Sequence, residues 1–206
     1  TEAVNPAGPY FSTYQTSSVG SAQITNYSTI SQEVDTYLFQ IDYLSCQSQS
    51  NLGTTQSRPQ AWAKNIVSVG GVSHNNTLTR ADDGISGASI GPAQDGRVKP
   101  DLAHFYESIY TTWTGNSYTQ FGGTSGATPI TAGHFGLLMQ MWHQGVWAGF
   151  GGQSTVFLSR PFSTTAKALM CNGAFRYALG TLTRARQGWG MADLGYLYNS
   201  RNKTFI

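Results

Sequence analysis

The stretch that decides the fold is Gly122-Gly-Thr-Ser-Gly-Ala-Thr-Pro129, which stands directly before a long apolar segment, residues 130–142. Apolar residues recur in that segment at helical spacing, which predicts a long helix with one buried face. The first N–H groups of a helix have no intrahelical partner, and the helix dipole places partial positive charge at the same end. Ser125 therefore lies where a developing negative charge would be stabilised.

The residues around this serine are consistent with a reactive position. Gly122 and Gly123 have no Cβ, so a substrate backbone can approach them closely. Pro129 falls early in the predicted helix, where a missing N–H is least costly. Each feature alone is weak evidence, because small-residue turns before helices are common and most of their serines are structural.

Outward from this stretch, short buried strands alternate with helices. Strands are predicted at residues 42–46 and 65–70, the second ended by a Gly pair, and shorter segments at 101–103 and 108–112. Helices are predicted at residues 30–42, with Ser31 as a possible N-cap, and at 163–174, capped by Ser163 or Thr164. The other long segments, residues 1–30, 47–59, 84–100 and 145–161, are interpreted as loops or extended chain. This alternation is typical of an α/β fold with a mostly parallel sheet.

The composition excludes several classes of protein. The chain has 206 residues and a net charge of +2, and only 11% of its residues are charged. Five Trp, eleven Tyr and ten Phe argue against disorder. The sequence has no run of Lys or Arg of the kind that binds nucleic acid, and no apolar stretch is long enough for a membrane span. Two cysteines, Cys46 and Cys171, fit either two thiols or one bridge.

The run Gly123-Thr-Ser-Gly-Ala-Thr-Pro129, followed by Ala132-Gly133, resembles the nucleophile motif of subtilisin-like serine proteases, the subtilases. That motif is usually Gly-Thr-Ser-Met-Ala-Thr-Pro, so Gly126 is the one departure within the seven residues. The resemblance continues in the family's order through Ala63-Lys-Asn-Ile-Val-Ser-Val-Gly-Gly71, Gly96-Arg-Val-Lys-Pro-Asp-Leu102 and Gly188-Trp-Gly-Met-Ala-Asp-Leu194. It implies a three-layer α/β fold, and a serine endopeptidase that forms an acyl-enzyme on Ser125.

The resemblance also assigns substrate-facing positions. Ser48-Gln-Ser-Asn51 stands where subtilases have Ala-Ala-Gly-Asn, which implies that Asn51 donates to the oxyanion together with the Ser125 N–H. The segment of Ser48, Gln49 and Ser50 would form one wall of the pocket for the residue before the scissile bond, narrowed by its larger side chains. Ser18, Val19 and Gly20 are the candidate for the opposite wall, which pairs with the substrate backbone. Gly123 and Thr124 complete the predicted substrate contacts.

The Asp and His motifs that complete the subtilase triad are absent from this sequence. A serine needs a base, and the base needs an orienting carboxylate. His74, His104, His134 and His143 each have an ordinary structural explanation, and His104 is the least unsuitable of them as a base. His134, for example, lies nine residues along the helix from Ser125, roughly 13 Å away.

Three explanations for the missing triad residues stay open. In the first, the chain is the C-terminal portion of a subtilase catalytic domain and was separated by processing from an N-terminal fragment, or accompanies a companion chain, that carries Asp and His. In the second, the chain is a truncated product. Alternatively, it is a catalytically inactive subtilase-fold binding module. In this interpretation residues 1–30 provide loop and substrate strand, and residues 31–206 provide the core, the nucleophile helix and the closing segment.

Other expectations follow from the same pattern. Sedolisin-type peptidases share the nucleophile turn but use Asp at the oxyanion position, so Asn51 favours subtilase chemistry. An esterase elbow needs Gly-x-Ser-x-Gly, and Ala127 stands at its last position. No cofactor is required; subtilases often bind structural calcium, yet no Asp-rich loop stands out, and the pair Asp82-Asp83 is interpreted as a solvated turn. A secreted or lumenal location, a peptide substrate and no nucleic-acid or membrane partner complete the expectations.

Overall fold

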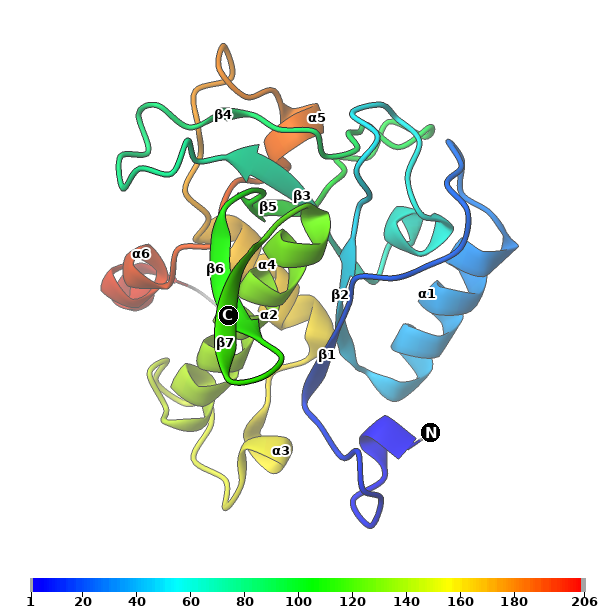
Figure 1. Cartoon of the computed structure of the whole chain (residues 1–206). Coiled ribbons are helices and arrows are strands. Elements are labelled where there is room, and N and C mark those ends of the chain that lie inside the picture. The colour runs from blue at the N-terminus through cyan, green and yellow to red at the C-terminus, as the bar shows by residue number, and fades with distance from the viewer. Residues whose placement is uncertain (1, 205–206) are drawn as a thin grey trace.

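The computed structural model describes residues 2–204, and its centre is a five-stranded sheet (Figure 1). The parallel strands β1 (Tyr14–Ser17), β2 (Leu44–Ser48), β3 (Val67–Ser73) and β5 (Leu102–Phe105) lie side by side in that order. The short β4 (Gly84–Ile85) pairs antiparallel with the end of β3. The prediction of a mostly parallel sheet flanked by helices is confirmed.

Helices cover both faces of the sheet and make three layers (Figure 1). Successive strand residues point to opposite faces. In β2, Leu44 and Cys46 pack in the main core with α2 (Thr124–His143) and α4 (Ser163–Asn172), whereas Ser45 and Gln47 face α1 (Thr29–Ile41). The segment after β2 forms η2 (Pro59–Trp62) on the α1 side.

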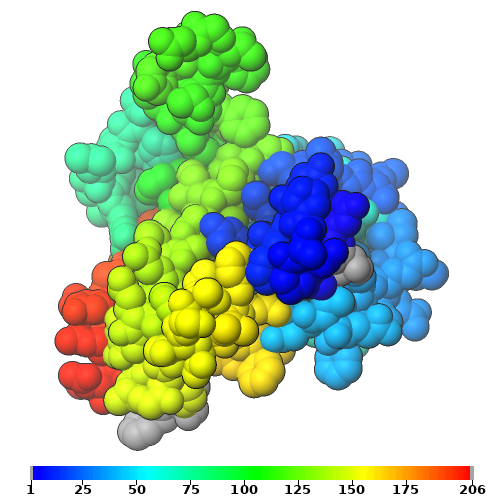
Figure 2. Space-filling model, turned by 90° about the horizontal axis from the view of Figure 1, so that it is seen from below, coloured from blue at the N-terminus to red at the C-terminus, as the bar shows by residue number. Residues whose placement is uncertain are grey.

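The antiparallel hairpin of β6 (Ile109–Trp113) and β7 (Ser117–Phe121) leads directly into α2 and projects from the body of the molecule (Figure 2). The remaining elements are η1 (Glu2–Val4), α3 (Val156–Ser159), α5 (Arg184–Gln187), α6 (Leu194–Asn199) and η3 (Arg201–Lys203). No helix within residues 2–204 has both the length and the apolar character needed to cross a bilayer.

The glycine pair does not end β3, contrary to the prediction. The strand continues through Gly70 and Gly71 to Ser73. A Cβ on Gly70 would lie 2.6 Å from Pro100 Cγ, and one on Gly71 would lie 2.4 Å from Tyr106 Cδ2. These glycines therefore permit close packing against neighbouring chain rather than a turn.

Both helix caps differ from the predicted ones. The N-cap of α1 is Ser28, and the Ser31 hydroxyl accepts from its backbone N–H at 3.1 Å. Ser163 is the first residue of α4, and its N–H and hydroxyl both donate to Asp42 Oδ1, at 2.9 and 2.8 Å. The start of α4 is therefore capped by Asp42, the residue after α1, and not by a neighbouring side chain.

The pair Asp82-Asp83 is not the solvated turn that was predicted. Asp83 is buried, and its carboxylate accepts from the Tyr177 hydroxyl, while Asp82 stays exposed and accepts from Thr77. Burial, and to a smaller extent the hydrogen bond to Asp83, raises the pKa of Tyr177 far above its ordinary value.

Both cysteines are free thiols, and burial raises the pKa of Cys171 to about 12.

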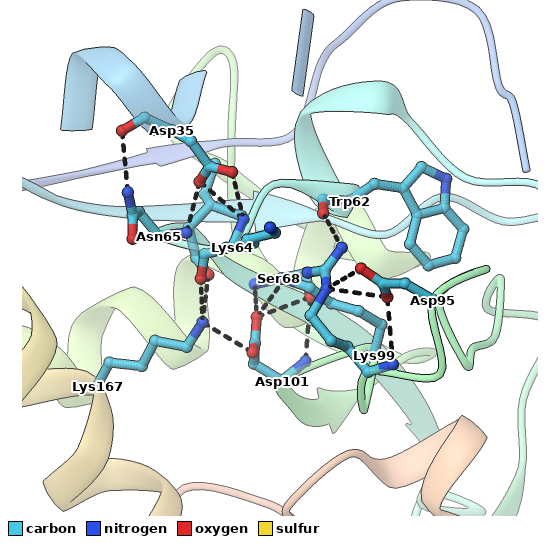
Figure 3. A network of polar contacts seen from close by, with 11 residues as sticks. Asp35, Trp62, Lys64, Asn65, Ser68, Asp95, Lys99, Asp101 and Lys167 are labelled. Carbon is cyan, nitrogen blue, oxygen red and sulfur yellow. Dashed lines mark hydrogen bonds and ion pairs between the residues drawn. The ribbon is translucent and has the colours of Figure 1, made fainter. Parts of the chain in front are cut away.

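A network of hydrogen bonds and ion pairs joins Ser68 of β3 and Lys99 and Asp101, just before β5, to Lys167 of α4 (Figure 3). The Asp101 carboxylate accepts from Ser68 N–H at 2.8 Å, Ser68 Oγ at 2.9 Å, and Lys99 and Lys167 Nζ at 2.8 Å each. Burial alone would raise the pKa of Asp101, but the two ammonium groups lower it to about 2. We refer to these four residues as the buried network.

Candidate active site

The nucleophile candidate lies at the start of α2, as its position in the sequence requires. Gly123 is the N-cap with φ of 79°, a conformation that favours glycine, and Ser125 is the second residue of the helix. The Ser125 N–H and hydroxyl have no hydrogen-bond partner within residues 2–204. One donor of the helix end is therefore free beside the serine.

Asn51 meets this helix end from the loop after β2. Its side-chain oxygen accepts from Thr124 N–H at 2.8 Å and from Thr124 Oγ1 at 2.9 Å. Both bonds use the oxygen, so the Nδ2 group stays free to donate. It lies 3.0 Å from the point where a Cβ on Gly123 would sit. The structure thus brings Asn51 and the start of α2 together, and we call residues 123–125 with Asn51 the helix mouth.

The segment Ser48, Gln49 and Ser50 is bonded to the same helix end. Ser50 N–H donates to Thr124 Oγ1 at 3.2 Å, and Ser50 has φ of 108°. That region of φ favours glycine, which the subtilase pattern has at this place. Ser48 and Gln49 are fully buried, and both Gln49 amide atoms lack a partner within the described chain.

The candidate substrate segment follows β1 and reaches the serine from the other side. Ser18 Oγ donates to the backbone oxygen of Ser125 at 3.0 Å. Val19 is 74% exposed, and its carbonyl accepts from Gln47 Nε2 at 2.9 Å. Gly20 O accepts from Arg58 Nη1 at 2.8 Å. Ser18, Asn51 and Ser125 come from three parts of the chain and lie at one place.

The departure from the subtilase motif at Gly126 has a steric explanation. A Cβ on Gly126 would lie 2.4 Å from Ile109 Cδ1 and 3.4 Å from Phe121 Cδ1. Side chains of the hairpin fill the space that a larger residue would need. The hairpin therefore packs against the first turn of the nucleophile helix.

Two further residues position the mouth and were not identified from the sequence. Tyr106 O accepts from Gly123 N–H at 2.6 Å, and the Tyr106 side chain packs where Gly71 and Gly87 leave room. Ser89 Oγ accepts from Leu52 N–H at 3.1 Å, and its N–H donates to Ser50 O at 2.7 Å. No local pattern marks either residue, because each acts through a partner distant in sequence.

None of the four histidines contacts Ser125. Their ring nitrogens bond instead to Glu107 O (His74), Phe105 N–H (His104), Ile130 O (His134) and Ser159 Oγ (His143), at distances from 2.6 to 2.9 Å. Burial, reinforced by His134, Arg80 and His74, lowers the pKa of His104 to about 3. A group of that pKa is a poor general base, because the base works best with a pKa near the operating pH.

Within residues 2–204, no group of three or more His, Cys, Asp or Glu is arranged to hold a metal ion. The helix mouth instead holds a hydroxyl, a side-chain amide and a backbone N–H on residues that lie together. Acyl-transfer chemistry uses groups of these kinds together with a base, and no base is among the described contacts of Ser125.

Comparisons with known proteins agree with this class. The sequence pattern of the subtilase family matches residues 12–190. The chain belongs to the subtilase family. A search of curated proteins found no matching relative.

Solved structures with the same fold include the prenylagaramide maturation protease PagA, with a TM-score of 0.71 and 14% identity over 98% of this chain and 65% of that one. The S218A mutant of the PatA protease domain has a TM-score of 0.69 and 16% sequence identity, over 98% of this chain and 62% of that one. The PatG macrocyclase in complex with peptide has a TM-score of 0.69 and 14% sequence identity, over 94% of this chain and 53% of that one. The chain thus spans less than two thirds of the length of these proteins.

Proposed function

We propose that this chain carries the nucleophile half of a serine endopeptidase. The observation that carries the proposal is the orientation of Asn51, whose oxygen is held by Thr124 while its Nδ2 remains free beside Gly123, two residues before Ser125. An oxyanion needs donors that are in place before the reaction begins. The Ser125 N–H and Asn51 Nδ2 are two such donors.

In the proposed reaction, Ser125 Oγ attacks the peptide carbonyl carbon and its proton passes to a histidine base. The carbonyl oxygen becomes the oxyanion between Ser125 N–H and Asn51 Nδ2. The C–N bond then breaks, the histidine returns the proton to the leaving amine, and water hydrolyses the acyl-enzyme. The substrate backbone lies along Ser18, Val19 and Gly20, with Gly123 and Thr124 leaving room for it.

The histidine and its aspartate come, in this proposal, from an N-terminal segment of the same protein or a companion chain. The open edge of β1 supports this. Within the described residues β1 pairs only with β2, and its other edge is free. A groove lined by Tyr14, Gly136 and Leu137 lies on its α2 side, and one lined by Gln15, Ser17 and Tyr37 lies on its α1 side. An added strand with its own side chains would fill both grooves.

The chemistry requires no cofactor, and any bound calcium would have a structural role. We further propose a secreted or lumenal location, from the composition rich in neutral polar residues. The alternative is a catalytically inactive binding module, in which Ser125 stays unactivated.

Labelling with a serine-directed fluorophosphonate tests the proposal. The complete protein containing this chain should be labelled at Ser125, located by peptide mass, while the Ser125→Ala variant should not. Mass analysis and N-terminal sequencing of every co-purifying chain should find a segment bearing the Asp and His motifs. An unlabelled protein that holds such a segment would favour the inactive module instead.

A further inference from the structure

Arg58 lies between the two segments, Ser48–Ser50 and Ser18–Gly20, that the subtilase resemblance assigns to the walls of the substrate pocket. Its backbone N–H donates to Gln49 O at 3.4 Å, on the segment that leads to Asn51. Its Nη1 donates to Gly20 O at 2.8 Å and to Ser21 O at 3.5 Å, on the opposite segment. The residue is thus anchored at one wall of the pocket and places its guanidinium against the other.

The charge of Arg58 is not neutralised by the protein. The ion pairs within residues 2–204 are Arg80–Asp193, Arg97–Asp95, Lys99–Asp101 and Lys167–Asp101, and none includes Arg58. Arg58 is partly exposed, and its buried Nε has no hydrogen-bond partner within residues 2–204. Because no carboxylate of the described chain pairs with this guanidinium, its exposed N–H groups are available to an anionic partner from outside.

The surrounding residues hold the arginine in place. A Cβ on Gly20 would lie 2.7 Å from Arg58 Cδ, so only glycine lets the side chain pass this close. Ser57 Oγ, on the preceding residue, donates to Gln49 O, and Gln60 bonds to Ser21 through both its amide atoms, at 3.1 and 3.3 Å. The guanidinium is therefore positioned by its neighbours rather than free in solvent.

We propose that Arg58 selects an acidic side chain, Asp or Glu, at the substrate position immediately before the scissile bond. The inference rests on the proposed function, because it uses the same two walls. The guanidinium presents several N–H groups in a planar fork that matches the two oxygens of a carboxylate. A substrate Lys or Arg would meet a like charge at this place.

The test compares two fluorogenic peptides that differ only in Glu or Gln before the scissile bond, cleaved by the complete protein. A hydrogen bond to a charged group is worth about 1.5–3 kcal/mol, so kcat/KM should be roughly 10- to 100-fold higher for the Glu peptide. The Arg58→Met variant keeps the side-chain length and should bring the ratio near one. Arg58→Lys keeps the charge without the fork and should retain part of the preference.

Arg201→Met is the matched control, because Arg201 lies in η3 and, within residues 2–204, its guanidinium donates only to Tyr198 O. It removes the same charge and should leave the ratio unchanged. Fluorophosphonate labelling of each variant shows that its active site is still assembled.

The ratio should also depend on pH. It should fall as pH decreases through the ordinary pKa of a glutamic acid, about 4.3, because the protonated side chain resembles Gln. Since both peptides meet the same triad, loss of the catalytic base cancels in the ratio. A purely structural role of Arg58 would give no such dependence.

The outcomes separate this inference from the proposed function. A labelled protein that prefers Gln or an apolar residue, or an Arg58→Met variant that keeps the Glu preference, would overturn the role of Arg58 alone. A protein that neither becomes labelled nor cleaves any peptide would overturn the proposed function and this inference with it.

Discussion

The helix mouth and the buried network are both clusters of polar groups beside the same parallel strands, but they use their hydrogen bonds differently. In the buried network, the Asp101 carboxylate accepts from Ser68, Lys99 and Lys167, so the protein itself supplies its partners. At the helix mouth, Ser125 N–H and its hydroxyl have no partner within residues 2–204, and Asn51 commits only its oxygen.

This difference is the one expected between a structural cluster and the reactive cluster that we propose. A buried charge is stable only when its partners are supplied by the protein, as they are for Asp101. A catalytic site must instead keep its donors free and correctly aimed until the substrate arrives. At the helix mouth, Thr124 donates to the side-chain oxygen of Asn51. This fixes the amide and leaves its Nδ2 group free to donate to a substrate.

The largest expected effect is that of Ser125→Ala on peptidase activity. If the free hydroxyl is the nucleophile, kcat of the complete protein should fall by roughly 10⁴–10⁶-fold. The thermal unfolding midpoint should change little, because the hydroxyl makes no hydrogen bond to the part of the chain that the structure describes. Steady-state kinetics and calorimetry measure the two effects, and unchanged proteolysis would remove the mouth from consideration as a reactive cluster.

Asp101→Asn should show the opposite pattern, with stability affected and chemistry unaffected. Removing one partner of a buried ion pair typically costs about 3–5 kcal/mol, because Lys99 and Lys167 would remain charged beside a neutral amide. Denaturant unfolding measures the loss. Asp95→Asn is the control, since Asp95 is exposed at the surface and such pairs contribute about 0–1 kcal/mol. Equal losses in the two variants would contradict the distinction drawn here.

Asn51→Ala sharpens the comparison within the mouth itself. Loss of one oxyanion donor should lower kcat by roughly 10²–10³-fold while KM stays similar. Thr124→Val is a useful partner variant, because it removes one of the two bonds that orient Asn51 and should give a smaller decrease in kcat. A change in KM alone would indicate that Asn51 binds substrate without stabilising the oxyanion.

The smallest expected effect concerns pH and His104. Its pKa in the folded chain, about 3, lies below the ordinary value of 6.5, so the unfolded chain binds more protons between these values. Stability should therefore fall with decreasing pH, by about 2–3 kcal/mol between pH 6.5 and 4.5. The groups facing this ring are His134, His74 and Arg80.

Unfolding by denaturant at several pH values measures this dependence. The His104→Leu variant should have a flatter acid limb, whereas His143→Gln, which alters a partly exposed ring, should keep the original slope. A His104→Leu variant as acid-sensitive as the unaltered protein would show that His104 is not held neutral by burial.

Most of the fold could be predicted from local sequence patterns. The apolar periodicity of residues 130–142 marked α2, because it reflects one buried helix face. The β-branched run before Gly70 marked β3, because this central strand is buried on both faces. β7 was not predicted, although Gly115-Asn116, both with positive φ, is a hairpin signal that precedes it. The caps of α1 and α4 were misplaced because the Ser31 hydroxyl donates to Pro59 O at 2.6 Å and Ser163 donates to Asp42, both far along the chain.

The sequence by itself determined that Ser125 stands at the start of a long helix, and that Asn51 follows a buried strand. Helix starts and buried strands are fixed by neighbours within a few residues, so their patterns are visible in the chain. Only the tertiary structure decided which atom of Asn51 is free, why residue 126 has no side chain, and where Arg58 points. Those contacts join residues that are distant in sequence, and they depend on how the layers pack together.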